Sequence, residues 1–191
     1  MARDKNNSTG SPVPRQDVGA GGPARSVDPR AMSMTQFELA LVVVHNAFSQ
    51  WTVRCGTAVG AGRFSSLELL VIGFLNAHDQ AVRATDISFA LKIEDTYTVQ
   101  YALKKLLAAG LVESARSGKE TLFTMTDAGR ALYRDYSVVR SKFLLDAMAM
   151  LSEDGLDMDG LVSRLRAISG IYEQAARNAA SVSFASDIAK R

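Results

Sequence analysis

Residues 95–112, DTYTVQYALKKLLAAGLV, place hydrogen-bonding and cationic side chains on one side of a predicted helix. Helical spacing gathers Val99, Leu103 and Leu106 on the opposite side, which is the side expected to face a core. The polar side carries Thr96, Gln100, Tyr101, Lys104 and Lys105, with no acid among them. Such a face is either an ordinary solvated surface or a surface shaped to lie against a negatively charged partner.

The types of these side chains suit the major groove of duplex DNA. An α-helix fits that groove, where base edges present a readable pattern of donors and acceptors, and a glutamine can bond adenine through two hydrogen bonds. Thr96 and Thr98 near the helix start, and Gln100 and Tyr101 one turn later, have the chemistry for bases or phosphates. Lys104 and Lys105 lie farther along, where we expect phosphate contacts.

A predicted β-hairpin follows this helix and adds two more cations. Residues 111–116 and 120–125 read as strands around the turn Ser117-Gly118-Lys119, with Arg116 and Lys119 beside its tip. Between Thr96 and Lys119 the cations are Lys104, Lys105, Arg116 and Lys119 and the acid is Glu113, a net charge of +3. This local excess is a modest electrostatic footprint for nucleic acid.

Further helices are predicted to position this region. A helix from Met34 carries an apolar stripe of Phe37, Leu41, Val44, Phe48, Trp51 and Cys55. This helix is predicted to be interrupted at residues 56–63. A buried helix over 65–77 follows, and HDQAV reads as a turn. A short helix of about residues 84–91 should turn Ile87, Ala90 and Leu91 inward. After the hairpin, a long helix is predicted to begin at Thr126-Asp127 and to end at about Leu151. A last helix carries a second apolar stripe, formed by Leu161, Leu165, Ile168, Tyr172, Ala175 and Ala179.

The fold class predicted from this order is mainly α with a small two-stranded β wing. Residues 1–33, which contain all four prolines, read as a disordered tail that is either a passive leader or a weak DNA contact. Residues 34–191 read as a single domain. Residues 65–126 form its winged helix-turn-helix, and residues 34–62 and 127–185 form flanking helices suited to dimerisation.

Composition excludes several classes of function. The net charge of +2 is too small to indicate nucleic acid by itself, and one cysteine excludes an intramolecular disulfide. Two histidines without a Cys/His cluster argue against zinc, and we expect no metal and no cofactor. No catalytic motif is apparent, so we expect no enzyme. No stretch approaches the length of a membrane span, and we expect a cytoplasmic, nucleoid-associated protein without membrane contact.

The chain resembles the MarR family of transcriptional regulators over roughly residues 35–180. The most specific matches are Thr98, Val99, Leu103, Leu106, Gly110, Leu111 and Val112, and then Thr126 and Gly129 after the hairpin. The resemblance implies a homodimer with interlocking terminal helices that reads a pseudo-palindrome, most often as a repressor. The wing departs from the family pattern: it reads SARSGKET, and Arg116 and Lys119 are its only cations.

These features predict a sequence-specific regulator of double-stranded DNA, acting as a homodimer, with a small-molecule effector left open. Trp51, Tyr133, Tyr136 and Tyr172 either line a pocket for such an effector or belong to the core. Cys55 is either a redox sensor or an inert packed thiol. The alternative function is a winged-helix protein-interaction adaptor. A nonspecific nucleoid binder is a weaker alternative, because nonspecific affinity needs more positive charge.

Overall fold

The computed structural model describes residues 29–78, 80–153 and 155–181, which divide into two compact units at residue 44. Helix α1 spans Pro29–Ala58 and therefore begins before the expected Met34. Residues 29–33, which were expected to belong to the tail, are helical, and residues 1–28 lie outside the described part. The first unit contributes only the N-terminal half of α1 to the described residues, and every other element belongs to the second unit.

The core of the second unit is built around α2 (Ser66–Asn76), α3 (Ala84–Leu91) and α4 (Thr96–Ala108). Its largest fully buried apolar side chains are Val71, Ile72, Ile87, Val99, Leu103 and Leu106. Helix α2 is buried on most sides, as the sequence predicts, because it packs against α4, α5 and β3. This packing leaves only one side of α4 open to solvent.

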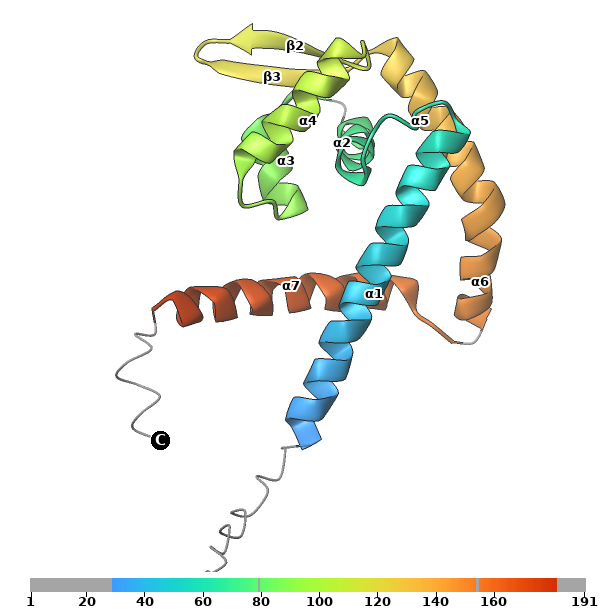
Figure 1. The fold of residues 1–191 in the computed structure, drawn as a ribbon, viewed down its shortest axis with the longest axis vertical. Coiled ribbons are helices and arrows are strands. Elements are labelled where there is room, and N and C mark those ends of the chain that lie inside the picture. Colours follow the sequence, from blue (N-terminus) through green and yellow to red (C-terminus); the bar gives the residue numbers. More distant parts are fainter. Residues whose placement is uncertain (1–28, 79, 154, 182–191) are drawn as a thin grey trace, which may run out of the picture. The chain divides into compact units, whose positions relative to one another are not determined.

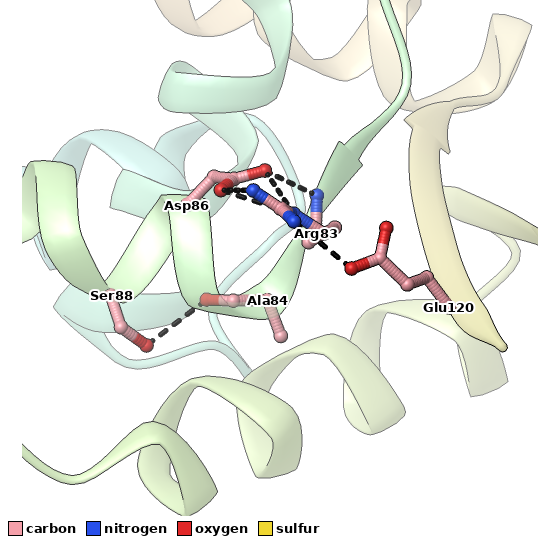
Figure 2. Close-up of polar contacts among 5 residues, drawn as sticks. All are labelled: Arg83, Ala84, Asp86, Ser88 and Glu120. Atoms are coloured by element: carbon pink, nitrogen blue, oxygen red, sulfur yellow. Dashed lines mark hydrogen bonds and ion pairs between the residues drawn. The ribbon is translucent and has the colours of Figure 1, made fainter.

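The inward face of α3 differs from the prediction at one position. Ala90 is exposed, and the buried residues are Ala84, Ile87 and Ser88. The Ser88 hydroxyl is satisfied because it donates to the Ala84 carbonyl oxygen at 3.0 Å (Figure 2). A serine that bonds back to the preceding turn can be buried in a helix, so the apolar spacing alone gave the wrong face here.

The sheet has three strands rather than two. Strand β1 (Val82–Arg83) pairs antiparallel with β3 (Glu120–Met125). β3 pairs with β2 (Val112–Ser117) in the expected hairpin, which Figure 1 shows. In the register, Val82 lies opposite Phe123 and Arg83 opposite Leu122. A strand of two residues is too short to show alternation, so the segment read as a turn. β1 ties the start of α3 to the wing.

After the wing the chain is helical to Glu153, as expected, with one local change. Helix α5 (Asp127–Arg140) passes into a π-helical turn at Ser141–Leu145 and then into α6 (Asp146–Glu153). The last helix, α7, spans Met158–Ala180 and has no buried residue. π turns are rare and mostly occur as single turns inside α-helices, so the sequence patterns did not predict this one.

The last residue of the stripe on α1, Cys55, belongs to the second unit and is buried within it. Cys55 is 1% exposed, and its thiol donates to the Tyr136 carbonyl oxygen at 3.6 Å. Burial raises the pKa of this thiol, although Arg140 acts in the opposite direction. A buried thiol with a raised pKa is a poor nucleophile, which favours the packed, inert reading of Cys55.

Within the described residues, no helix is long and apolar enough to cross a bilayer. The same residues contain no group of three or more histidine, cysteine or acidic side chains that is placed to hold a metal ion.

The joint between α4, the wing and α5 depends on Gly129. The Thr126 hydroxyl donates to the Gly110 carbonyl oxygen at 2.7 Å and accepts from the Gly129 N–H at 3.1 Å. A Cβ at residue 129 would overlap the Leu111 carbonyl oxygen, which itself accepts from the Thr126 N–H.

We expect Gly129→Ala to lower the free energy of unfolding by about 1–3 kcal/mol, because backbone cannot move aside as a side chain can. Gly73→Ala is the matched control. Its Cβ would meet only the Tyr133 ring at 3.5 Å, an ordinary contact, and we expect no loss. Urea unfolding of both variants measures the difference. Equal stability of the two would contradict the close approach at Gly129.

Candidate nucleic-acid interface

Helix α4 presents the polar face that the sequence predicts. Its core side is closed, and Thr98, Gln100 and Lys104 are exposed on the other side, with Thr96 half-buried. Tyr101 is 63% exposed. The helix begins at Asp95, whose carboxylate accepts from the Tyr97 N–H at 2.9 Å and from the Thr98 hydroxyl at 3.3 Å.

Tyr97 is a further exposed side chain that the sequence reading missed. It lies in the first turn of α4 and is 78% exposed, more than Tyr101. A large aromatic side chain left in solvent beside hydroxyl and amide groups is suited to stacking or hydrogen bonding with a partner. In the sequence, its position between Thr96 and Thr98 in the first turn of the predicted helix could have identified it.

Lys105 differs from the other predicted contacts because it is tied to the core. Its ammonium lies 2.9 Å from the Glu68 carboxylate on α2 and 5.2 Å from the centroid of the Tyr101 ring. Glu68 is 3% exposed, so this carboxylate needs a partner. Lys105 therefore serves first as the counter-ion of a buried acid, and Lys104 is the more available cation.

Glu68 is held ionised by its neighbours. Burial opposes its ionisation, but hydrogen bonds from the Ser65 hydroxyl, from Lys105 and from the Ser65 N–H together lower its pKa below the ordinary value of 4.5. The bond to Glu68 raises the pKa of Lys105 in turn. The pair joins the start of α2 to α4.

The wing carries Arg116 and Lys119 as expected, and both are exposed. At its base lies an ion-pair network that the sequence reading did not identify. Arg83 on β1 pairs with Asp86 at 2.8 Å and with Glu120 on β3 at 2.9 Å, as Figure 2 shows. These hydrogen bonds raise the pKa of Arg83 and lower that of Asp86. Because its partners lie in different elements, Arg83 connects the start of α3 to the wing.

A depression of about 490 Å³ lies beside this network. It is lined from β1, α3, α4 and β3, by Arg83, Ala84, Thr85, Gln100, Glu120, Thr121 and Phe123. Gln100 therefore faces a hollow between the helix-turn-helix and the wing. Of the residues predicted to act together, the structure brings Gln100 to this hollow, and it adds Arg83 and Glu120.

The electrostatic footprint is smaller than the sequence count suggested. Lys105 is paired with Glu68, and Glu120 lies one residue beyond the stretch that was counted. Lys104, Arg116 and Lys119 remain as exposed cations for which no ion pair is found in the described part of the chain. Three dispersed cations support docking on phosphates but do not supply strong nonspecific affinity.

Comparison with known proteins identifies the domain that carries this surface. Residues 64–129 match the family model of a winged helix DNA-binding domain. This part of the chain is therefore similar to winged helix DNA-binding domains. The match runs from α2 to the start of α5 and includes α4 and the wing. None of the curated proteins matches the chain in sequence.

Solved structures of MarR regulators share the fold of the winged helix and its flanking helices. A MarR family regulator from Neisseria meningitidis is 17% identical with a TM-score of 0.61, and the match covers 76% of this chain and 97% of that one. The transcriptional repressor CouR, bound to a 23-mer DNA duplex, is 21% identical with a TM-score of 0.58, covering 75% and 99%. MarR from Staphylococcus aureus, in complex with salicylate and kanamycin, is 17% identical with a TM-score of 0.55, covering 76% and 94%. The MarR-type fold predicted from the sequence is confirmed.

The ion pair between Glu68 and Lys105 makes the stability of this winged helix depend on pH. Because the pKa of Glu68 is lowered by folding, its contribution is complete above about pH 4.5, the ordinary value, and is lost as the pH falls through the lowered value. We expect Glu68→Gln to reduce the free energy of unfolding at pH 7 by about 1–3 kcal/mol. The difference from the unchanged protein should shrink below pH 4.5, as measured by urea unfolding across pH.

Asp127→Asn is the control for this prediction. Asp127 pairs with Arg130, but the Asp127 side chain is fully exposed, so we expect this substitution to leave the free energy of unfolding nearly unchanged. The assignment of Glu68 as a buried anion would be contradicted if the loss in free energy of unfolding caused by Glu68→Gln stayed constant as the pH falls.

Proposed function

We propose that the chain is a sequence-specific transcriptional regulator of double-stranded DNA, a repressor that acts as a homodimer on a pseudo-palindromic operator. The observation that carries the proposal is the exposed face of α4 within a winged helix DNA-binding domain. That face offers hydroxyl, amide, phenol and ammonium groups and no carboxylate between Thr96 and Lys105. It suits a surface of base edges bordered by phosphates.

The contacts divide by position along α4 and the wing. We assign contacts with base edges to Gln100 and Tyr101. Thr96 and Thr98 are assigned contacts with either bases or phosphates. Lys104 is assigned to phosphate, and Arg116 and Lys119 to the backbone or minor groove beside the wing. Lys105 is assigned a positioning role through Glu68, because its ammonium is already engaged at 2.9 Å.

The homodimer is supported by apolar surface on the flanking helices. On α1 the exposed large apolar side chains include Leu39, Val42, Val43, Val44 and Phe48, and on α7 they include Val162, Leu165 and Ile171. Helices of a monomeric protein rarely leave this much apolar surface in water. A second copy of the chain would cover it, and a two-fold dimer would present two recognition helices to half-sites about one helical turn of DNA apart.

A small-molecule effector belongs to the proposal as a modulator of DNA binding. Its support is the shared fold with a MarR protein solved in complex with salicylate and kanamycin. In this chain Tyr133 and Tyr136 stack with ring centroids 6.0 Å apart, and Tyr133 packs on the core. An effector would act by favouring one of two spacings of the recognition helices. The same proposal places the protein on chromosomal DNA in the cytoplasm.

Substitutions on α4 should separate base reading from phosphate binding. We expect Gln100→Ala combined with Tyr101→Ala to reduce affinity for the operator by about 1–3 kcal/mol per lost base contact while leaving affinity for unrelated DNA nearly unchanged. Lys104→Ala should weaken binding to all sequences about equally and lower the salt dependence by about one unit of slope. Fluorescence anisotropy titrations on operator and scrambled duplexes measure both effects. Equal losses on both duplexes for both variants would refute the division of roles.

The proposed function itself is tested by selecting duplexes from a random library with the purified full-length protein. The affinity for the selected duplexes is then measured as a function of salt concentration. We expect an enriched inverted repeat whose affinity falls steeply as salt rises. Absence of enrichment from a folded, dimeric protein would favour the adaptor function. Sequencing the winners also gives the half-site spacing.

A further inference from the structure

Lys92, in the turn between α3 and α4, has a backbone conformation that lysine rarely adopts. Its φ of 56° lies in the left-handed region, and no other non-glycine residue of the described ranges has a positive φ. Glycine or asparagine is usual at such a helix end, where the conformation closes the last turn. The Ile93 N–H accordingly donates to the Ser88 carbonyl oxygen at 2.9 Å. A lysine here carries backbone strain that glycine would avoid, which suggests that the side chain itself has a role.

The side chain of Lys92 makes two contacts. Its ammonium lies 4.6 Å from the centroid of the Phe89 ring on α3, and Phe89 is 76% exposed. The same ammonium lies 2.9 Å from the Glu173 carboxylate on α7. Lys92 therefore joins the last turn of α3 to a helix about 80 residues later in the sequence.

On α7 the partner is oriented by its own neighbours. Lys92 lowers the pKa of Glu173, and Ser169 on the preceding turn donates to its carboxylate at 3.5 Å. Arg177 on the following turn adds a favourable charge. No residue of α7 is buried in the single chain, so its side chains are not fixed by a core on the side of α3.

We propose that Lys92 and Glu173 are a positioning pair that fixes the angle between the helix-turn-helix and α7, and thereby the half-site spacing that the dimer accepts. The proposal rests on the proposed function and deepens it. The turn that contains Lys92 leads directly into α4 at Thr96, and α7 belongs to the surface assigned to the dimer. A tie between them determines how far apart the two recognition helices of a dimer lie.

The energy of the pair suits this role better than a role in holding the fold together. Both side chains are about half exposed, at 48% and 39%, and exposed pairs contribute little to stability. A weak tie can still select among orientations that differ little in energy. We therefore expect its loss to change spacing preference and leave unfolding nearly unchanged.

The test uses the full-length protein and the charge-reversal variants Lys92→Glu, Glu173→Lys and the double reversal. Each is titrated against the selected operator and against operators with the half-sites one base pair closer or farther apart. We expect each single reversal to reduce the preference for the selected spacing by roughly twofold to fivefold, and the double reversal to restore it. Lys92→Gly keeps the backbone conformation without the side chain and should also lose the preference.

Glu173→Lys separates this mechanism from simple electrostatics. An added cation should tighten binding to all duplexes if charge alone matters, whereas the positioning pair predicts a changed ranking of spacings. A loss of affinity confined to Lys92→Glu, equal for all spacings and not restored in the double reversal, would mean that Lys92 contacts phosphate directly. That result would overturn the proposal.

Hydrogen exchange of the free protein tests the pair without DNA. We expect Glu173→Lys to accelerate exchange of the amides at residues 92–96, and the double reversal to slow it again, with thermal stability unchanged. Unchanged exchange in the single reversals would overturn the positioning pair whatever the DNA results. Failure of the library selection with the expected exchange pattern would instead refute the proposed function and leave the pair as a tie between α3 and α7.

Discussion

The buried carboxylate of Glu68 is the constraint on which the arrangement of the recognition surface depends. An unpaired charge inside a core is strongly unfavourable, so α2 can pack only where Ser65 and Lys105 reach this group. Lys105 is supplied by α4, on which Val99, Leu103 and Leu106 form the buried side. The ion pair therefore acts together with these apolar side chains to keep the polar side of α4 in solvent.

Much of the fold follows from patterns that are local in sequence. Thr126 before Asp127 and the apolar spacing of Val99, Leu103 and Leu106 are short-range signals, and the structure realises them as a capped α5 and the inward face of α4. The features that were missed are non-local or weak. β1 depends on the pairing of Val82 with Phe123, which are distant in sequence, and the π turn at Ser141–Leu145 is a rare local variation within a helix.

The candidate site shows the same division. The exposed polar side of α4 was predictable because helical spacing alone separates it from the core. The engagement of Lys105 was not predictable, because its partner lies 37 positions earlier in the chain. Arg83 and Glu120 are also 37 positions apart and meet only through the pairing of β1 with β3. Counting charges along the sequence could not show which cations are already neutralised.

The hydrogen bonds around Thr126 link the end of α4, the base of the wing and the start of α5 directly. The backbones of Gly110, Leu111 and Gly129 approach one another there so closely that a Cβ at residue 129 would not fit. Under the proposed function, a recognition helix and a wing joined in this way would not adjust separately to a groove of unusual width. The duplex would then supply the adjustment by bending or changing its groove width, and the flexibility of base steps that no side chain touches would contribute to specificity.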